Sequence, residues 1–128
     1  MAVQAIAKGV RISPRKVSVV AALVRGRTVE DAVTILEHTP RRAALAVKKA
    51  VQSAAANADH NHNLKPGTLN IVEITVQAGP RLKRYRPASH GRALPFQRRT
   101  SHIRVVVDGE ARPSRKPAAE KPAKKEAK

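Results

Sequence analysis

The side chains whose chemistry stands out lie between positions 79 and 107, where every charged residue is cationic. Most of them are arginines, whose planar guanidinium makes paired hydrogen bonds to phosphate and stacks on bases. A dense cationic segment of this kind predicts contacts with the phosphates of a nucleic acid. Its charged residues are Arg81, Lys83, Arg84, Arg86, Arg92, Arg98, Arg99 and Arg104.

The histidines are the other candidates for chemistry, and they are His38, His60, His62, His90 and His102. His60 and His62 stand next to Asp59 in a polar stretch that we expect to be a loop. A metal site needs three or four converging ligands with supporting partners, and the sequence offers no further carboxylate–histidine motif. We therefore expect no metal, no cofactor and no catalytic site. His102 lies in a strand pattern, where it is expected to contact phosphate or sugar.

The composition indicates a polyanionic partner. The chain has 128 residues with 26 Lys and Arg against 9 Asp and Glu, a net charge of +17 and a pI near 11.6. One Phe, one Tyr and no Trp exclude a row of stacking platforms for single-stranded bases. The absence of Cys excludes disulfides and thiolate metal sites. No apolar run is long enough to span a membrane, so we expect an intracellular protein that binds no membrane.

Periodicity predicts three helices. Ser13 and Pro14 begin the first, which ends at Gly26. Thr28 begins the second with an acidic residue three positions later. Thr39 and Pro40 begin the third, which the polar residues 57–63 end. The apolar stripes are Val17, Val20, Ala21 and Val24; Val29, Ala32, Val33 and Leu36; and Ala44, Val47, Val51, Ala54 and Ala58.

Strand patterns flank the cationic segment. Residues 1–12 alternate weakly, and two clearer strands cover residues 69–78 and 102–108. Their inward residues are expected to be Val72, Ile74, Val76 and Ala78, and Ile103, Val105 and Val107. The segment between them, residues 79–101, is too long for a tight turn. It is either a solvated loop or, as the converging strands favour, a long hairpin with arms of about ten residues that reach roughly 30 Å.

We interpret residues 1–109 as a single α/β domain that includes this hairpin. Residues 110–128 contain Pro, Ala, Lys and Glu without a large apolar residue, so we expect a disordered basic tail. Such a tail also occurs in DNA-compacting proteins, which remain an alternative, although their arms are usually paired. A further basic face on the third helix is either solvated or bound to phosphate, and it comprises Arg41, Arg42, Lys48 and Lys49.

Four stretches resemble one known family. "RISPRKV", "AALVRGRTVEDAVTILEHTPRRAALAVKKAVQSAAANADHN", "KRYRPASHGRA" and "RRTSHIRVVV" are similar to the ribosomal protein twenty-two family of the bacterial large subunit. The similarity runs from about Ala5 to Val107. It implies an α+β fold in which three helices pack on a three-stranded antiparallel sheet, two of whose strands extend as a long basic β-hairpin.

The resemblance also implies a function. Such a protein is a non-enzymatic, structural constituent of the large ribosomal subunit that binds its rRNA and aids assembly in the cytoplasm. It is a monomer within the particle, beside neighbouring ribosomal proteins, with its body near the outer opening of the peptide exit tunnel. The rRNA-binding residues are then expected to be Arg11, Arg15, Lys16, Arg25, Arg81, Lys83, Arg84, Arg86, Arg92, Arg98, Arg99, His102 and Arg104.

The hairpin tip is implied to line the tunnel and meet the nascent peptide. It comprises Arg86, Pro87, Ala88, Ser89, His90, Gly91, Arg92 and Ala93. Tyr85 and His90 stand where many family members have an aliphatic and a basic residue. Leu94, Pro95 and Phe96 replace a more charged stretch. These departures bear on the geometry of the tip and not on the existence of the hairpin.

Overall fold

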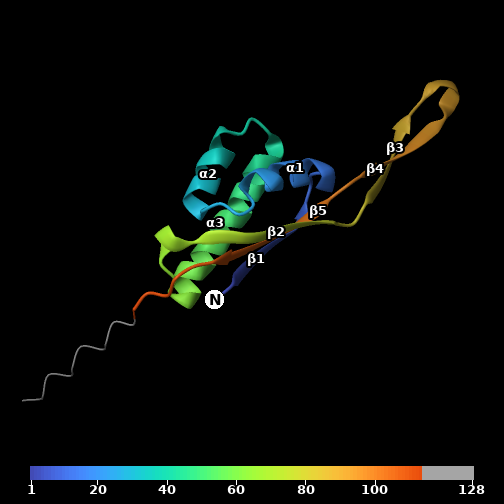
Figure 1. Cartoon of the computed structure of the whole chain (residues 1–128). Coiled ribbons are helices and arrows are strands. Elements are labelled where there is room, and N and C mark those ends of the chain that lie inside the picture. Colours follow the sequence, from blue (N-terminus) through green and yellow to red (C-terminus); the bar gives the residue numbers. More distant parts are fainter. Residues whose placement is uncertain (114–128) are drawn as a thin grey trace, which may run out of the picture.

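The computed structural model describes residues 1–113, which form a body of helices and sheet and a narrow arm that projects from one end of it (Figure 1). The body and the arm are both antiparallel in their strand pairing. The elements are β1 (Val3–Val10), α1 (Pro14–Val24), α2 (Val29–His38), α3 (Arg42–His62), η1 (Pro66–Thr68), β2 (Asn70–Ala78), β3 (Leu82–Pro87), η2 (Ser89–Gly91), β4 (Ala93–Arg98) and β5 (Ser101–Asp108).

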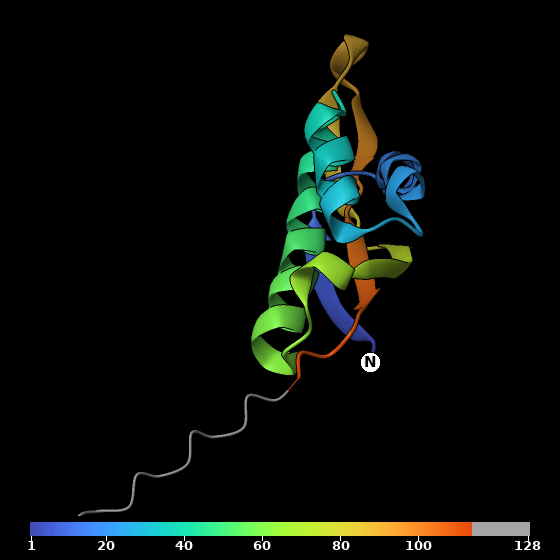
Figure 2. The ribbon, with the colours of Figure 1, turned by 60° about the vertical axis from the view of Figure 1, so that its left-hand side comes forward.

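The body sheet has the order β1-β5-β2, with the helices packed on one of its faces (Figure 2). α3 lies along β1 and β5, while α1 lies against β2. Ile103, Val105 and Val107 of the central strand are fully buried. The three apolar stripes are buried as expected, with only Val33 partly exposed. The small side chains of α3 let that helix approach the sheet closely, so a core without large aromatic residues is still filled.

Two of the expected helix boundaries are wrong. α3 begins at Arg42, because the Thr39 hydroxyl donates to the Ile35 carbonyl at 2.7 Å and so completes the end of α2 instead. The polar stretch after residue 57 does not end α3 at once. The helix runs to His62 and ends where Asn63 turns left-handed (φ 50°), a conformation that Asn tolerates better than most residues.

The other two helix starts are as expected, and each has its own local cause. α1 begins at Pro14, whose ring fixes the first helical φ, but the Ser13 side chain makes no capping bond. At α2 the Thr28 hydroxyl accepts the Asp31 N–H at 3.3 Å, which satisfies a free donor at the helix start.

The alternation expected in β2 breaks at Val72. A register shift between Ile71 and Glu73 inserts one extra residue opposite β5, so Val72 turns outward and is 59% exposed. Ile71 and Ile74 are buried in its place. Such a bulge moves side chains to the opposite face of the sheet, and a run of adjacent apolar residues conceals it in the sequence.

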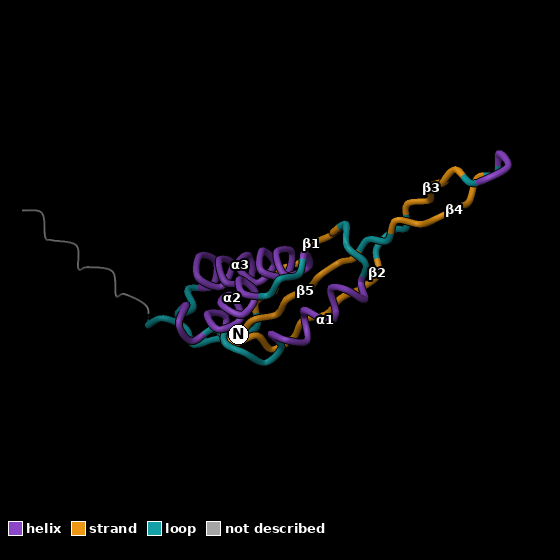
Figure 3. Tube along the Cα trace, turned by 90° about the horizontal axis from the view of Figure 1, so that it is seen from above, coloured by secondary structure: helices purple, strands orange, loops and turns teal. Residues whose placement is uncertain are grey.

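The expected single three-stranded sheet, with two strands continuing into the hairpin, is also corrected. There are five strands in two sheets: the body sheet, and a separate pair formed by β3 and β4. Pairing of β2 with β5 ends at Ala78 and Ser101, and pairing of β3 with β4 begins at Leu82 and Arg98. Residues 79–81 link β2 to β3, whereas only residues 99–100 link β4 to β5, so the two links differ in length. In addition, Pro80 has no N–H to donate. The two sheets are therefore joined by short links, and Figure 3 shows the arm leaving the body there.

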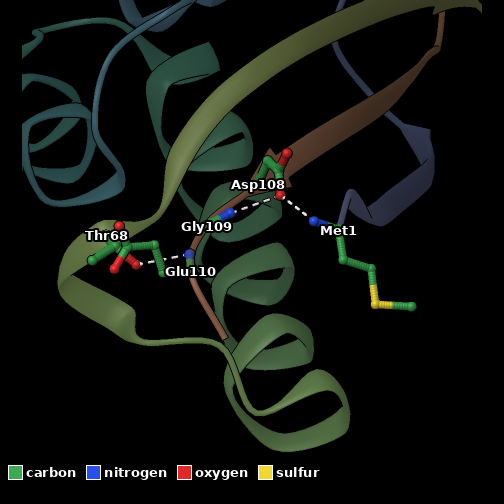
Figure 4. A network of polar contacts seen from close by, with 5 residues as sticks. All are labelled: Met1, Thr68, Asp108, Gly109 and Glu110. Carbon is green, nitrogen blue, oxygen red and sulfur yellow. Dashed lines mark hydrogen bonds and ion pairs between the residues drawn. The ribbon is translucent and has the colours of Figure 1, made fainter. Parts of the chain in front are cut away.

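Polar contacts close the end of the body far from the arm (Figure 4). The N-terminal ammonium of Met1 donates to Asp108 at 2.7 Å, and the Gly109 N–H donates to the same carboxylate at 2.9 Å. These two hydrogen bonds, the ammonium first, hold the pKa of Asp108 below its ordinary value. The Glu110 N–H donates to the Thr68 hydroxyl at 3.1 Å.

The chain stays in contact with the body after Gly109. The Glu110 carbonyl accepts the Lys65 N–H at 2.9 Å, and the Arg112 N–H donates to the Asn63 carbonyl at 2.8 Å. The Arg112 guanidinium also pairs with Asp59 at 2.8 Å. The remainder of the tail expected from the sequence, residues 114–128, lies outside the described residues.

Candidate nucleic-acid interface

A basic groove lies where the arm meets the body. Its volume is about 740 Å³, and three separate parts of the chain line it: residues 11–16, residues 41–43 and residues 97–99. Among the residues that the structure describes, no acidic side chain lines the groove. Its seven cationic residues, all exposed, are Arg11, Arg15, Lys16, Arg41, Arg42, Arg98 and Arg99.

The N-terminal ends of two helices line this groove. Arg15 and Lys16 belong to the first turn of α1, and Arg42 and Ala43 belong to the first turn of α3. Neither Ser13 nor Arg41 makes a side-chain capping bond, and neither first turn contains an acidic residue. The free backbone N–H groups of a helix start carry partial positive charge. They add to the charge of the seven side chains, so the groove suits an anion.

The arm carries further cations along both of its faces. Arg84 pairs with Phe96 and Arg86 pairs with Leu94, so these residues share one face with Arg98. Arg86 and Arg98 lie over the Phe96 ring, with 5.7 Å and 5.6 Å from each guanidinium carbon to the ring centre. Cation–π contacts of this kind hold the flexible arginines in place.

The opposite face of the arm presents Lys83, Tyr85 and Gln97. The Tyr85 side chain is 74% exposed. A shallow hollow of about 420 Å³ on the arm shares two of its lining residues, Gln97 and Arg99, with the groove. The cationic surface is therefore continuous from the groove onto the arm.

A tight turn forms the tip. The Ala88 N–H donates to the Arg92 carbonyl at 2.8 Å, which closes the loop beyond the last strand pair. His90 and Gly91 both have positive φ, 60° and 68°. Glycine adopts this conformation freely, whereas histidine adopts it only occasionally. The departure at His90 noted in the sequence thus falls on a residue that shapes the turn.

His102 and Arg104 lie on the sheet face that the helices leave open. The His102 Nδ1 accepts the Gly9 N–H at 3.0 Å. The Arg104 Nε–H donates to the Gln4 side chain at 3.0 Å. Both residues are therefore held by neighbouring β1, and neither lines the groove.

The structure gathers five of the residues expected to bind RNA in the groove: Arg11, Arg15, Lys16, Arg98 and Arg99. Those on the arm and on the open sheet face form two further surfaces. Arg25 joins none of them, because its guanidinium donates to the Ile74 carbonyl at 3.0 Å and fastens α1 to β2. Arg25 thus has a structural contact that its sequence position did not indicate.

The basic face expected on α3 divides into two parts. Arg41 and Arg42 line the groove, and they are the two groove cations missing from the expected RNA-binding set. The available clue was that both directly follow Thr39 and Pro40, which the sequence suggested as the start of this helix. Lys48 instead pairs with Glu37 of α2 at 2.8 Å. The hydrogen bond from Lys48, and then its charge, hold the pKa of Glu37 below its ordinary value.

The histidine pair gives no support to a metal site. His60 and His62 lie in the last turn of α3, not in a loop as expected. Among residues 1–113, no group of three or more His, Cys, Asp or Glu side chains is placed to hold a metal ion. No helix within this part of the chain is both long and apolar enough to cross a membrane.

Comparison with known proteins identifies the family of the chain. The family model for ribosomal protein L22p/L17e matches residues 5–108. The large ribosomal subunit protein uL22 of Desulforamulus reducens is 52% identical over 107 residues, covering 84% of this chain and 95% of that protein. The protein of the same name from Clostridium tetani is 50% identical over 107 residues, covering 84% and 96%. By name, both relatives are proteins of the large ribosomal subunit. The resemblance seen in the sequence is confirmed: the chain belongs to the ribosomal protein L22p/L17e family.

Proposed function

We propose that the chain is a structural constituent of the large ribosomal subunit, where it binds rRNA and aids assembly. The observation that carries this proposal is the continuous cationic surface formed by the groove and the arm. The seven groove cations make no ion pair with any described residue. Their charge is thus available to a polyanion, whose binding removes the repulsion between them.

The arm supports contact with folded RNA rather than with isolated bases. Its paired strands offer guanidinium groups on one face and the Lys83 ammonium on the other, and only Tyr85 and Phe96 are aromatic. Phosphate contacts position a protein without reading sequence. We therefore propose that specificity arises from the shape of the rRNA segments between which the arm lies. The contacting residues are those expected from the sequence, extended by Arg41 and Arg42.

We further propose that the tip, residues 86–93, lines the nascent-peptide exit tunnel. Its narrow turn supports this role, because three small residues, Ala88, Ser89 and Ala93, keep it slim. The proposed partners are rRNA, neighbouring large-subunit proteins and the nascent peptide, with one copy of the chain in each particle.

The domain organisation is part of the same proposal. Residues 1–109 form one RNA-binding domain that includes the arm, and residues 110–128 form a basic tail. The start of that tail is bonded to the link between α3 and η1. We propose that its lysines add phosphate contacts that do not depend on RNA sequence.

Reconstitution of large subunits from rRNA and variant chains tests the proposal. Replacing Arg98 and Arg99 with Ala should weaken incorporation and lower the salt slope of RNA binding by roughly one for each lost phosphate contact. Replacing Arg27 and Lys49, which lie outside the groove, removes the same charge and should have less effect.

Deletion of residues 88–90 is the second variant of this test. It removes no arginine or lysine, so assembly should persist, while the binding of tunnel-directed inhibitors to the assembled particle should change. If this deletion blocks assembly as strongly as loss of the two arginines, the tip is an RNA anchor and its assigned role is wrong.

A further inference from the structure

The basic groove has walls that belong to two different bodies. Residues 11–16 and 41–43 belong to the helical body, whereas Gln97 and Arg98 belong to β4 of the arm, and Arg99 follows them. An anion in the groove would therefore touch the body and the arm at once. Any change in the direction of the arm would change the shape of the groove.

The connection between the two bodies is slight. In the links at residues 79–81 and 99–100, the Gly79 N–H donates to the Thr100 carbonyl at 2.8 Å. The Thr100 hydroxyl donates to the Pro80 carbonyl at 2.6 Å. These bonds replace the regular ladder, since pairing of β2 with β5 stops at Ala78 and that of β3 with β4 starts at Leu82. A joint with so few bonds bends more readily than a continuous sheet.

Charge in the groove acts on this joint. Arg98 and Arg99 on the arm side face Arg11, Arg15, Lys16, Arg41 and Arg42 on the body side. Like charges across the groove repel in the absence of an anion, and this repulsion favours an open arrangement. A ligand with several negative charges reverses the effect, because it attracts both walls. Two uncapped helix starts on the body side add N–H donors to that attraction.

We propose that the groove is a phosphate site whose occupancy fixes the direction of the arm relative to the body. Its volume of about 740 Å³ and its seven cations exceed what a single phosphate needs. The ligand is therefore a chain of neighbouring phosphates, supplied by an RNA backbone or by linear polyphosphate. The inference rests on the proposed rRNA binding only in that rRNA is the source of these phosphates within the ribosome. It adds that binding at the groove orients the arm relative to the body.

Distance measurement between two spin labels tests this proposal directly. The chain has no Cys, so Gln52→Cys on α3 and Ser89→Cys at the tip, both exposed, give one labelled pair. The distribution of distances should be broad in the free protein. It should narrow on addition of inorganic tripolyphosphate, and likewise on addition of a short RNA duplex.

Two matched variants of the labelled protein provide the comparison. Lys16→Gln with Arg42→Gln removes one lysine and one arginine from the body wall of the groove. Lys49→Gln with Arg27→Gln removes the same types elsewhere. The groove variant should need about tenfold more tripolyphosphate to narrow the distribution, on the scale of one charge-assisted hydrogen bond. The control variant should behave like the parent, and all should retain the same helical circular dichroism.

The outcomes separate this inference from the proposed function. Narrowing by both ligands, or by RNA alone, supports the inference if the groove variant impairs it, and RNA alone identifies the backbone as the source. Equal responses of the groove and control variants overturn it, as does an unchanged distribution when RNA is bound. Failure of the chain to bind any RNA counts against the proposed function instead. The titration with tripolyphosphate still tests whether the groove is a phosphate site.

Discussion

Gly79 occupies the tightest point of the joint between body and arm, and a methyl group added there should destabilise the protein. A Cβ at this position would stand 2.5 Å from the Thr100 hydroxyl oxygen and 3.2 Å from the His102 ring. Thr100 is only 6% exposed, and its hydroxyl is bonded to the Pro80 carbonyl. The side chain therefore cannot turn away without breaking that bond.

The magnitude follows from two opposing effects. Overpacking costs about 1–3 kcal/mol, whereas replacing Gly by Ala restricts the unfolded chain and contributes about 0.4–1 kcal/mol in the other direction. Steric overlap should win, so we expect Gly79→Ala to lower the free energy of unfolding by about 1–2 kcal/mol. Gly67→Ala is the matched control. Its Cβ would meet only the Glu30 carboxylate, at 3.9 Å.

Urea unfolding of the double-mutant cycle of Gly79→Ala and Thr100→Ala tests whether steric overlap causes the loss of stability. Thr100→Ala alone should cost about 1 kcal/mol for the lost hydrogen bond. Because it also removes the overlapping oxygen, Gly79→Ala should cost less in that background, with a coupling of about 1 kcal/mol. Strict additivity of the two changes, or a Gly79→Ala variant as stable as Gly67→Ala, would refute the close approach on which the joint depends.

Three more changes test other parts of the structure. Gly91→Ala places a side chain at φ 68° and should disfavour the tip turn by about 1–2 kcal/mol, seen as altered tip resonances with an unchanged unfolding midpoint. Glu37→Gln removes the partner of Lys48. Because the pKa of Glu37 is lowered in the folded state, the contribution of this carboxylate to stability is present above the ordinary glutamate pKa and lost on acidification. Unfolding curves of parent and variant should therefore converge at acid pH. Ser101→Ala should raise the free energy of unfolding by up to about 1 kcal/mol, because this fully buried hydroxyl has no hydrogen-bond partner among the described residues; a loss of stability would reveal a partner.

The helical half of the fold could be predicted from the sequence because burial imposes a strict period. Val17, Val20 and Val24 recur at helical spacing, and all three are fully buried. Helix boundaries were less accessible, since Thr39 can serve either the helix before it or the helix after it. Only the bond from its hydroxyl to Ile35 decides between them.

The strands show where such patterns fail. Val72 directly follows the apolar Ile71, so alternation alone could not reveal that a bulge turns Val72 outward. The interruption between the two sheets depends on two hydrogen bonds, from the Gly79 N–H to the Thr100 carbonyl and from the Thr100 hydroxyl to the Pro80 carbonyl, and these bonds leave no periodic signal. The existence of an arm followed from its flanking strands, but its register did not.

The candidate interface was predictable in composition but not in assembly. The cations of the arm lie within one segment of the sequence, residues 81–99, so they could be grouped from the sequence alone. The groove joins residues that are more than 80 positions apart, such as Arg15 and Arg98, and only the tertiary fold brings them together. Arg25 illustrates the reverse case, because a similar side chain is engaged by a backbone carbonyl.

The structure of a large ribosomal subunit that contains this chain would test the central claim most directly, at a resolution where phosphates are visible. The account predicts an RNA strand in the groove, with phosphates within hydrogen-bond distance of Arg42 and Arg98 and with the tip at Gly91 facing the tunnel. A groove open to solvent, or an arm lying on the particle surface, would contradict it.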